Sequence, residues 1–235
     1  ISLISQEDLI QSGCYNIPEV VDIVESAFTA RAHNKVIFPA KISVVFDEVS
    51  QNRINCLPAG SYLESVYGMK WVSVFPENPK QYGIQNLSAV ILLSSLKTGF
   101  PMAFMEGTLC SNLRTAATSA IAAKYLAKED ATTIGFIGAG EQAKSHLMTM
   151  LHVRKGIKLC KVASRTHESE LKFINQMSRL YPNIDFIACN SAYKSAVDDA
   201  DIIVTAISGQ EMILKADWIK QGALYCHVGG LEDEY

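Results

Sequence analysis

The chain has 235 residues, of which 49% are hydrophobic and 19% are charged, a composition that excludes intrinsic disorder and supplies a buried core. Lys and Arg total 21 against 24 Asp and Glu, so no basic surface favours nucleic acid, and no apolar run approaches the roughly 18 residues that predict a membrane span. The six cysteines are scattered without a C-x-x-C pair and no export leader is recognisable, so we expect free thiols and a cytoplasmic protein.

The first half of the chain is expected to mix helices with short strands. Apolar residues at helical spacing predict one helix: Val20, Ile23, Val24, Ala27 and Phe28. Asn16 and Pro18 supply its cap and its first-turn proline. Strands are predicted at residues 41–46, 69–75 and 89–93, separated by turn residues at 58–60, 76–79 and 99–101. An alanine-rich segment at 112–127 predicts a second helix.

The second half alternates strand and helix. Apolar runs predict strands at residues 133–137, 159–163, 184–188, 202–206 and 224–228, with helical stretches between them. Parallel strands need crossover helices, so the pattern predicts an α/β fold with a doubly wound parallel sheet. We expect a substrate-binding and dimerisation domain at 1–130 and a nucleotide-binding domain at 131–235. Because Tyr235 directly follows the fifth strand, we expect further residues of this domain beyond it.

A glycine-rich segment follows the first of these five strands. Gly138, Gly140 and Ala143 form a G-x-G-x-x-A pattern that opens a helix, which is the context of a dinucleotide-binding turn. Gly138 would permit the tight turn, Gly140 the approach of pyrophosphate, and Ala143 close packing of the helix. The first-turn amides, at Glu141, Gln142 and Ala143, would face the phosphates. We therefore expect a nicotinamide dinucleotide as cofactor.

The end of the second parallel strand bears on the choice between NAD and NADP. The acidic residue that commonly binds the ribose hydroxyls is replaced by Ser164, Arg165 and Thr166. These side chains would accept a 2′-phosphate, which indicates NADP. In the alternative interpretation, Arg165 is only a surface residue, and NAD binds without an acidic partner. The sequence leaves both cofactors open.

Three cations of the first half are candidates for binding an anion. Arg114 lies at the start of the alanine-rich helix, where unpaired amides favour anions and a guanidinium would clamp a carboxylate. Lys70 lies inside an apolar strand and is either solvated or directed into a pocket, and Lys41 lies near a strand end. Cys110 is interpreted as a packing residue. The five histidines lack metal-ligand spacing, so we expect no metal.

The chain resembles the ornithine cyclodeaminase/mu-crystallin family over nearly its whole length. The resemblance rests on these segments: Pro39-Ala-Lys41, Leu57-Pro-Ala-Gly60, Gly68-Met-Lys-Trp71, Asn78, Gly99-Phe-Pro-Met-Ala103, Met105-Glu-Gly107, Arg114-Thr-Ala-Ala117 and Gly138-Ala-Gly-Glu-Gln-Ala143. It implies a Rossmann domain, an α/β dimerisation and substrate domain, and a homodimer. It also implies hydride transfer at the α-carbon of an amino acid through an imine, with NAD or NADP.

The same resemblance implies roles for individual residues. Lys70 and Arg114 would bind the substrate carboxylate, Lys70 would also move a proton, and the catalytic acid would be Glu232 or Asp233. Lys41, in place of an arginine, and the Gly229-Gly-Leu-Glu232 stretch resemble the family branch that cleaves an N-(2-amino-2-carboxyethyl)-glutamate conjugate into 2,3-diaminopropionate and 2-oxoglutarate. Alternatives are ornithine cyclodeamination, and a ketimine reductase or ligand binder like mu-crystallin.

Overall fold

The computed structural model describes residues 1–47, 49–208 and 212–229. The chain divides into two compact units, Ile1–Arg114 and Thr115–Tyr235, so the division falls inside helix α4, Thr108–Leu126. Among the described helices, none is both long and apolar enough to cross a bilayer.

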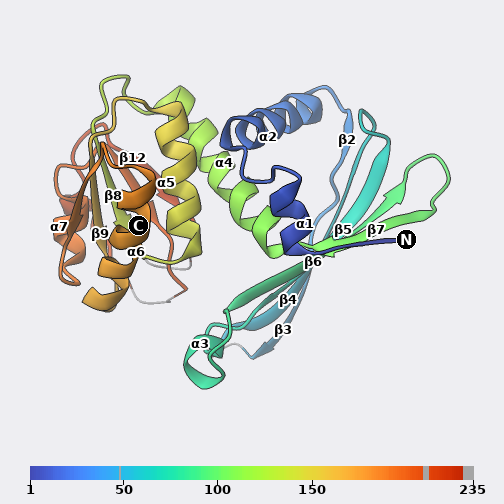
Figure 1. The fold of residues 1–235 in the computed structure, drawn as a ribbon, viewed down its shortest axis with the longest axis horizontal. Helices are drawn as coiled ribbons and strands as arrows, with labels where there is room; N and C mark the ends of the chain where they lie inside the picture. The colour runs from blue at the N-terminus through green and yellow to red at the C-terminus, as the bar shows by residue number, and fades with distance from the viewer. Residues whose placement is uncertain (48, 209–211, 230–235) are drawn as a thin grey trace. The chain divides into compact units, whose positions relative to one another are not determined.

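The first unit is built around a seven-stranded mixed sheet (Figure 1). Its strands run in the order β1-β7-β6-β5-β4-β2, and β3 pairs with β4 beside β2. The strands are β1 Ser2–Ile4, β2 Val36–Ile37, β3 Ile42–Asp47, β4 Asn52–Ser61, β5 Val66–Val74, β6 Leu87–Ser95 and β7 Pro101–Glu106. The helices are α1 Gln6–Gln11, α2 Ile17–Ala32 and the single turn α3 Asn78–Gln81, and the first residues of α4 complete the unit.

Residues 58–60 do not form the predicted turn, because they lie within the ten-residue strand β4. Proline lacks the N–H that a sheet needs, which is why Pro58 indicates a break in sequence. On one side β4 pairs continuously with β5, whereas on the other β3 reaches only Cys56 and β2 begins at Gly60. Pro58 therefore lies in the gap between two short neighbours, where a missing N–H breaks no ladder.

The two faces of this sheet have different chemistry. Lys70 pairs with Leu57 on β4 and Ile91 on β6, so these three side chains share a face. Side chains one residue along point the other way. That opposite face carries exposed apolar residues from four strands, β1, β3, β5 and β7, here termed the apolar face: Leu3, Ile42, Val44, Tyr67, Trp71, Met102 and Phe104.

Helix α2 forms where the apolar stripe predicts a helix, but the residues that it buries are not those of the stripe. The helix runs from Ile17 to Ala32, with Asn16 as N-cap. The Asn16 side chain makes no capping hydrogen bond and donates instead to the Glu19 carboxylate at 3.0 Å. Within this chain the helix buries Val21 and Ala30, whereas Phe28 of the stripe stays 50% exposed.

The second unit is a doubly wound parallel sheet, as the sequence predicts. Its elements are β8 Thr133–Ile137, α5 Glu141–Val153, β9 Leu159–Ala163, α6 His167–Leu180, β10 Asp185–Ala188, α7 Tyr193–Val197, β11 Ile202–Thr205, the 3₁₀ turn Ala216–Trp218 and β12 Leu224–His227. The strand order is β10-β9-β8-β11-β12, with every pair parallel. The order reverses between β8 and β11, and ligands of such sheets bind at the carboxyl ends of the strands there.

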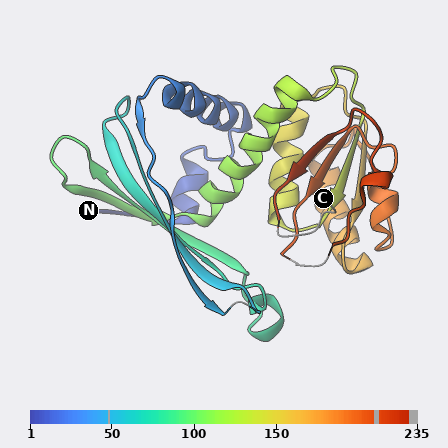
Figure 2. The ribbon, with the colours of Figure 1, turned by 180° about the vertical axis from the view of Figure 1, so that it is seen from behind.

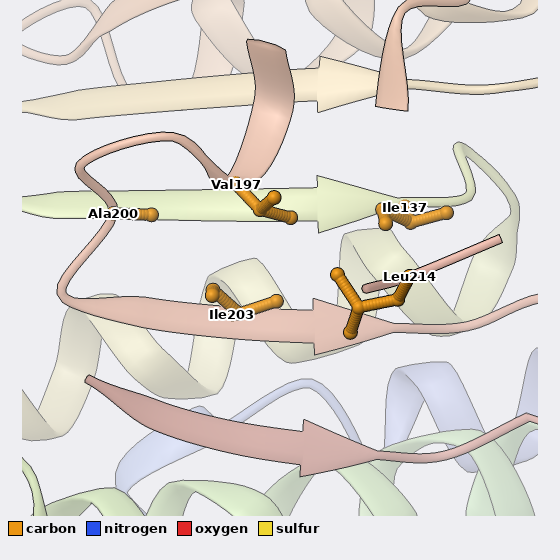
Figure 3. Close-up of a cluster of buried hydrophobic side chains, with 5 residues drawn as sticks. All are labelled: Ile137, Val197, Ala200, Ile203 and Leu214. Carbon is orange, nitrogen blue, oxygen red and sulfur yellow. The ribbon is translucent and has the colours of Figure 1, made fainter. Parts of the chain in front are cut away.

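Helices cover both faces of the parallel sheet, with α5 and α7 on opposite sides (Figures 1 and 2). On the α7 side, Ile137, Val197, Ala200, Ile203 and Leu214 form a buried cluster (Figure 3). Helix α7 approaches β8 so closely that a Cβ on Gly135 would lie 2.1 Å from the Ala196 carbonyl oxygen. The carboxyl end of β8 is therefore held by a rigid core.

Candidate functional site

The turn between β8 and α5 has the geometry of a dinucleotide-binding loop. Gly138 has a φ of +109°, which side-chain-bearing residues rarely adopt, and a Cβ there would lie 2.4 Å from the Ala206 carbonyl oxygen. Gly140 is the N-cap of α5 in an extended conformation, and a Cβ on it would meet no atom within 4 Å. The fold thus requires glycine at Gly138, whereas Gly140 leaves open space for a phosphate.

Helix α5 presents its positive end at this turn. The helix has 13 residues, and its first-turn amides, at Glu141, Gln142 and Ala143, have no acceptor within the helix. Ala143 is fully buried, so the helix packs tightly on the sheet, and the Glu141 carboxylate pairs with Lys144 at 2.6 Å. With the two glycines, these features fit a dinucleotide pyrophosphate.

A buried histidine that the sequence reasoning did not single out stabilises this helix start. His146 Nδ1 lies 2.7 Å from the Gln142 carbonyl oxygen, which only accepts, so Nδ1 donates. Nε2 then accepts from the Ser119 hydroxyl at 3.1 Å. Burial lowers the pKa of His146 to about 4, so the ring is neutral near pH 7 and holds both partners. No sequence pattern marks His146, because one of its partners is a backbone carbonyl and the other is a serine on another helix.

The loop after β9 brings the three predicted ribose-side residues to the carboxyl edge of the sheet. Ser164 is buried, and its hydroxyl donates to the Thr166 carbonyl oxygen at 2.8 Å. Thr166 caps α6 by accepting from the Ser169 amide. Arg165 between them is exposed. Thr166 is exposed as well, but its hydroxyl is used as the cap of α6, so Arg165 is the one of the three with an exposed side chain that makes no hydrogen bond or ion pair within the described residues.

The carboxylate of Glu170, which the sequence reasoning missed, organises this edge. It is fully buried and accepts from the amides of Ser164, Asn190 and Ser191 at 2.8–2.9 Å. Burial alone would raise its pKa, but these donors and His167 lower the pKa of Glu170 below its ordinary value. The Glu170 carboxylate thus connects the loops that follow β9 and β10. No sequence motif indicates this role of Glu170.

In the first unit, the structure brings Lys70 together with the start of α4. Lys70 Nζ donates to the Ser111 hydroxyl at 2.9 Å, across a sequence separation of 41 residues. Burial, and then the nearby Arg114 guanidinium, lower the pKa of Lys70 to about 8. Burial also lowers the pKa of Arg114. Two adjacent cations without their full hydration favour an anion, and a carboxylate is one group that lysine and arginine side chains can both bind.

Most of the amides at the start of α4 already have an acceptor within the chain, contrary to the sequence argument that they favour an anion. Glu106 accepts from the amides of Thr108 and Leu109, and the Ser111 amide donates to the Gly107 carbonyl. Arg114 lies in the second turn of the helix. It is therefore the side chains, and not the helix terminus, that make this a cationic site.

The thiol of Cys110, on the same helix as Ser111 and Arg114, is held in its protonated form. Burial raises the pKa of its thiol to about 12, and the Cys14 thiol that is hydrogen-bonded to it contributes to the rise. A thiolate is the reactive form, so the packing interpretation of Cys110 agrees with its surroundings.

Of the remaining predicted residues, Lys41 is exposed and directly precedes β3. Ile42 pairs with Cys56, so continuing the register by one residue places Lys41 opposite Leu57, the cross-strand partner of Lys70. Glu232 and Asp233 lie outside the described residues. Within the described ranges, no three His, Cys, Asp or Glu side chains cluster as metal ligands do.

Comparison with known proteins identifies the family. The model of the ornithine cyclodeaminase/mu-crystallin family matches residues 5–234. The chain belongs to this family. One relative is the N-((2S)-2-amino-2-carboxyethyl)-L-glutamate dehydrogenase of Staphylococcus aureus strain NCTC 8325 / PS 47, 31% identical over 96% of this chain and 68% of that protein.

Two solved structures of the family resemble this fold closely. The Δ1-pyrroline-2-carboxylate reductase of Thermococcus litoralis, in complex with NADH and L-proline, has a TM-score of 0.91 at 33% identity, over 97% of this chain and 69% of that one. An archaeal alanine dehydrogenase dimer with bound NAD has a TM-score of 0.83 at 29% identity, over 95% and 65%. The chain thus spans about two thirds of the length of these family members.

These matches confirm three predictions at the level of the family. The fold is the Rossmann-like α/β fold of the ornithine cyclodeaminase/mu-crystallin family. The class is that of NAD(P)-dependent amino-acid dehydrogenases and cyclodeaminases, and the cofactor is a nicotinamide dinucleotide.

Proposed function

We propose that this chain oxidises the α-carbon of an N-(2-amino-2-carboxyethyl)-glutamate-type conjugate. Hydride leaves the glutamate α-carbon, and the secondary amine becomes an imine. Water then cleaves the carbon–nitrogen bond of the imine. The products are 2,3-diaminopropionate, 2-oxoglutarate, reduced cofactor and a proton, so atoms and electrons balance.

The contact between Lys70 and Ser111, beside Arg114, carries this proposal. Lys70 and Arg114 are adjacent cations on the first unit, and Lys41 falls in the same row of the sheet as Lys70. The conjugate has three carboxylates, so a site with three cations suits it better than a site for a monocarboxylate. The 31% identity to the dehydrogenase of this chemistry, over 96% of the chain, favours the same substrate.

Each unit has its own part in this proposal. Gly138, Gly140 and the first turn of α5 would hold the pyrophosphate of NAD or NADP, which supplies a hydride acceptor when bound. In the first unit, Lys70 and Arg114 would orient the substrate by its carboxylate. Lys70 has a pKa of about 8, so about a quarter of it is the free amine near pH 7.5, which suits it to move a proton. Glu232, or Asp233, as the acid beside the iminium stays a prediction.

We propose that both dinucleotides bind. None of the three residues that follow β9, Ser164, Arg165 and Thr166, is acidic, and the exposed Arg165 would pair with a 2′-phosphate. NAD needs no such pair. The dissociation constants of NAD and NADP, measured by quenching of intrinsic fluorescence, test this.

The test of the proposed function is product analysis. The full chain is incubated with each oxidised cofactor and either the glutamate conjugate or L-ornithine, and products are identified by mass spectrometry. Diaminopropionate, 2-oxoglutarate and stoichiometric reduced cofactor are expected. Proline and ammonia without net reduction would instead make the chain an ornithine cyclodeaminase.

A second candidate is reduction of a cyclic ketimine. The fold matches the Δ1-pyrroline-2-carboxylate reductase with a TM-score of 0.91 at 33% identity. Oxidation of reduced cofactor by a cyclic imine, with no activity on the conjugate, would favour this candidate. Binding of cofactor without turnover of any of these compounds would favour a ligand binder.

We also propose that the chain forms a homodimer through the apolar face. Monomers rarely expose contiguous apolar patches of this kind, and a structural neighbour is a dimer. Phe104→Asp on this face is expected to give monomers by sedimentation velocity. Phe28→Asp, a similarly exposed phenylalanine on α2, is the control that leaves the dimer intact.

A further inference from the structure

We propose that Ser111 is a positioning residue that holds the Lys70 amine in place while Lys70 gains and loses a proton. The inference rests on the proposed function, because only a lysine that transfers a proton needs one partner for both of its forms. It stands on the 2.9 Å contact between Lys70 Nζ and Ser111 Oγ.

A hydroxyl is suited to this task because it both donates and accepts. The ammonium form of Lys70 has only donors, and one of them is directed at Ser111 Oγ. After deprotonation the amine has a lone pair, which accepts from the Ser111 hydroxyl after that hydroxyl rotates. Nζ therefore keeps the same neighbour at the same place in both states. A carboxylate only accepts and would favour the ammonium, and a side-chain amide would have to flip to change from acceptor to donor.

The surroundings of Lys70 make such a partner necessary. The groups that act on its charge are both on α4: Arg114, which repels the ammonium, and Cys110. Ser111 lies on the same helix, one residue after Cys110 and three before Arg114, and it is only 4% exposed. Water therefore does not readily replace the hydroxyl, and Arg114 alone would displace the lysine head. The serine opposes that displacement.

The experiment measures the protonation of Lys70 directly, without substrate or cofactor. Competitive labelling of the full chain with acetic anhydride, read by peptide mass spectrometry over a pH series, gives the midpoint of Lys70. The exposed Lys97 is the internal reference. Ser111→Thr and Ser111→Val are nearly isosteric and differ in the hydroxyl, and Ser111→Ala replaces the valine variant if that variant does not fold. Ser145→Ala, a buried helical serine in the second unit, is the matched control.

The valine variant is expected to lower the Lys70 midpoint by about one pH unit, because both forms lose a hydrogen bond and the charge-assisted bond of the ammonium is the stronger of the two. The threonine variant and the Ser145→Ala control should keep the midpoint of the parent chain. With the substrate found by product analysis, valine should lower kcat about tenfold with little change in KM, and should move the limb of the pH profile that follows Lys70 by the same amount as the midpoint.

The outcomes separate this inference from the proposed function. Equal midpoints for parent, threonine and valine overturn the role of Ser111, even if the conjugate is cleaved. A lower midpoint for valine that threonine restores supports it. If the parent chain turns over none of the three substrates, the proposed function fails, and the labelling series still decides whether Ser111 holds Lys70.

Discussion

Replacing Lys70 with methionine should make the folded chain more stable while it abolishes turnover. Methionine keeps most of the volume of the lysine stem and removes the charge. The ammonium is held in a partly buried place beside Arg114, which lowers the pKa of Lys70 from 10.5 to about 8. A group whose charge is disfavoured in the folded state destabilises that state, so its removal is expected to stabilise the fold.

The magnitude follows from the pKa. Each pKa unit corresponds to about 1.4 kcal/mol, so the full effect would be about 3 kcal/mol. Lys70 is only partly buried and water screens its charge, so we expect about 1–2 kcal/mol. Between the folded pKa of about 8 and the unfolded value of 10.5 the unfolded chain binds more protons. The stability of the parent therefore rises with pH in that window, and the advantage of the methionine variant shrinks.

The assay is urea unfolding in reducing buffer at about pH 7 and about pH 9.5. Trp71, next to Lys70 on β5, reports on the first unit when Trp218 is replaced by Phe in all variants. Lys97→Met, at an exposed lysine, is the control and should change little at either pH. A methionine variant that is less stable than the parent at neutral pH, or whose advantage does not shrink at high pH, would refute this reasoning. Turnover that survives in Lys70→Met would refute the role of Lys70.

Four further substitutions separate effects on the fold from effects on binding. Gly138→Ala should destabilise the second unit in thermal unfolding, because the φ of +109° and the Ala206 carbonyl oxygen, 2.4 Å from the added Cβ, exclude a side chain. Gly140→Ala should leave the stability unchanged and should weaken cofactor binding, measured by calorimetry. Arg165→Ala should weaken NADP about tenfold and leave the dissociation constant of NAD unchanged; equal losses for both cofactors would contradict the 2′-phosphate assignment. Glu170→Gln should destabilise the fold by about 1–3 kcal/mol near pH 7, since an amide donor then faces backbone donors. The lowered pKa of Glu170 means that its contribution is present above its unfolded pKa and is lost as the pH falls through the folded one, so the two proteins should converge in acid.

Much of the second unit was predictable because its signals are local. The five predicted strands match β8 to β12 to within one residue at each end, and α5 begins at Glu141 as expected. Buried parallel strands are continuous apolar runs, and Gly138 and Gly140 mark the turn by their residue type alone. The binding of ribose by Ser164, Arg165 and Thr166 stays a prediction from the same local pattern.

The first unit was predicted less completely, because its sheet depends on pairing between distant strands. The sequence reasoning missed β1, β2, β4, β7, α1 and α3, and it interpreted Pro58, which lies in β4, as part of a turn. Whether proline interrupts a strand depends on what lies beside it. The gap between β3 and β2 is a property of three segments together, and no window of sequence contains it.

The sequence by itself determined the fold class, the glycine turn and the candidate cations, because each depends on residue type and short spacing. Only the tertiary structure decided what surrounds them. Strand alternation did not decide which face of the sheet carries the Lys70 side chain. The register and the packing of α4 place it where its amine donates to the Ser111 hydroxyl, near Arg114. The fold also lets the Glu106 carboxylate accept from amides at the start of α4. In the second unit, it lets the Glu170 carboxylate accept from amides of the loops after β9 and β10. Burial and charge of a side chain depend on neighbours that are distant in sequence, so the chemistry of this site is decided by packing.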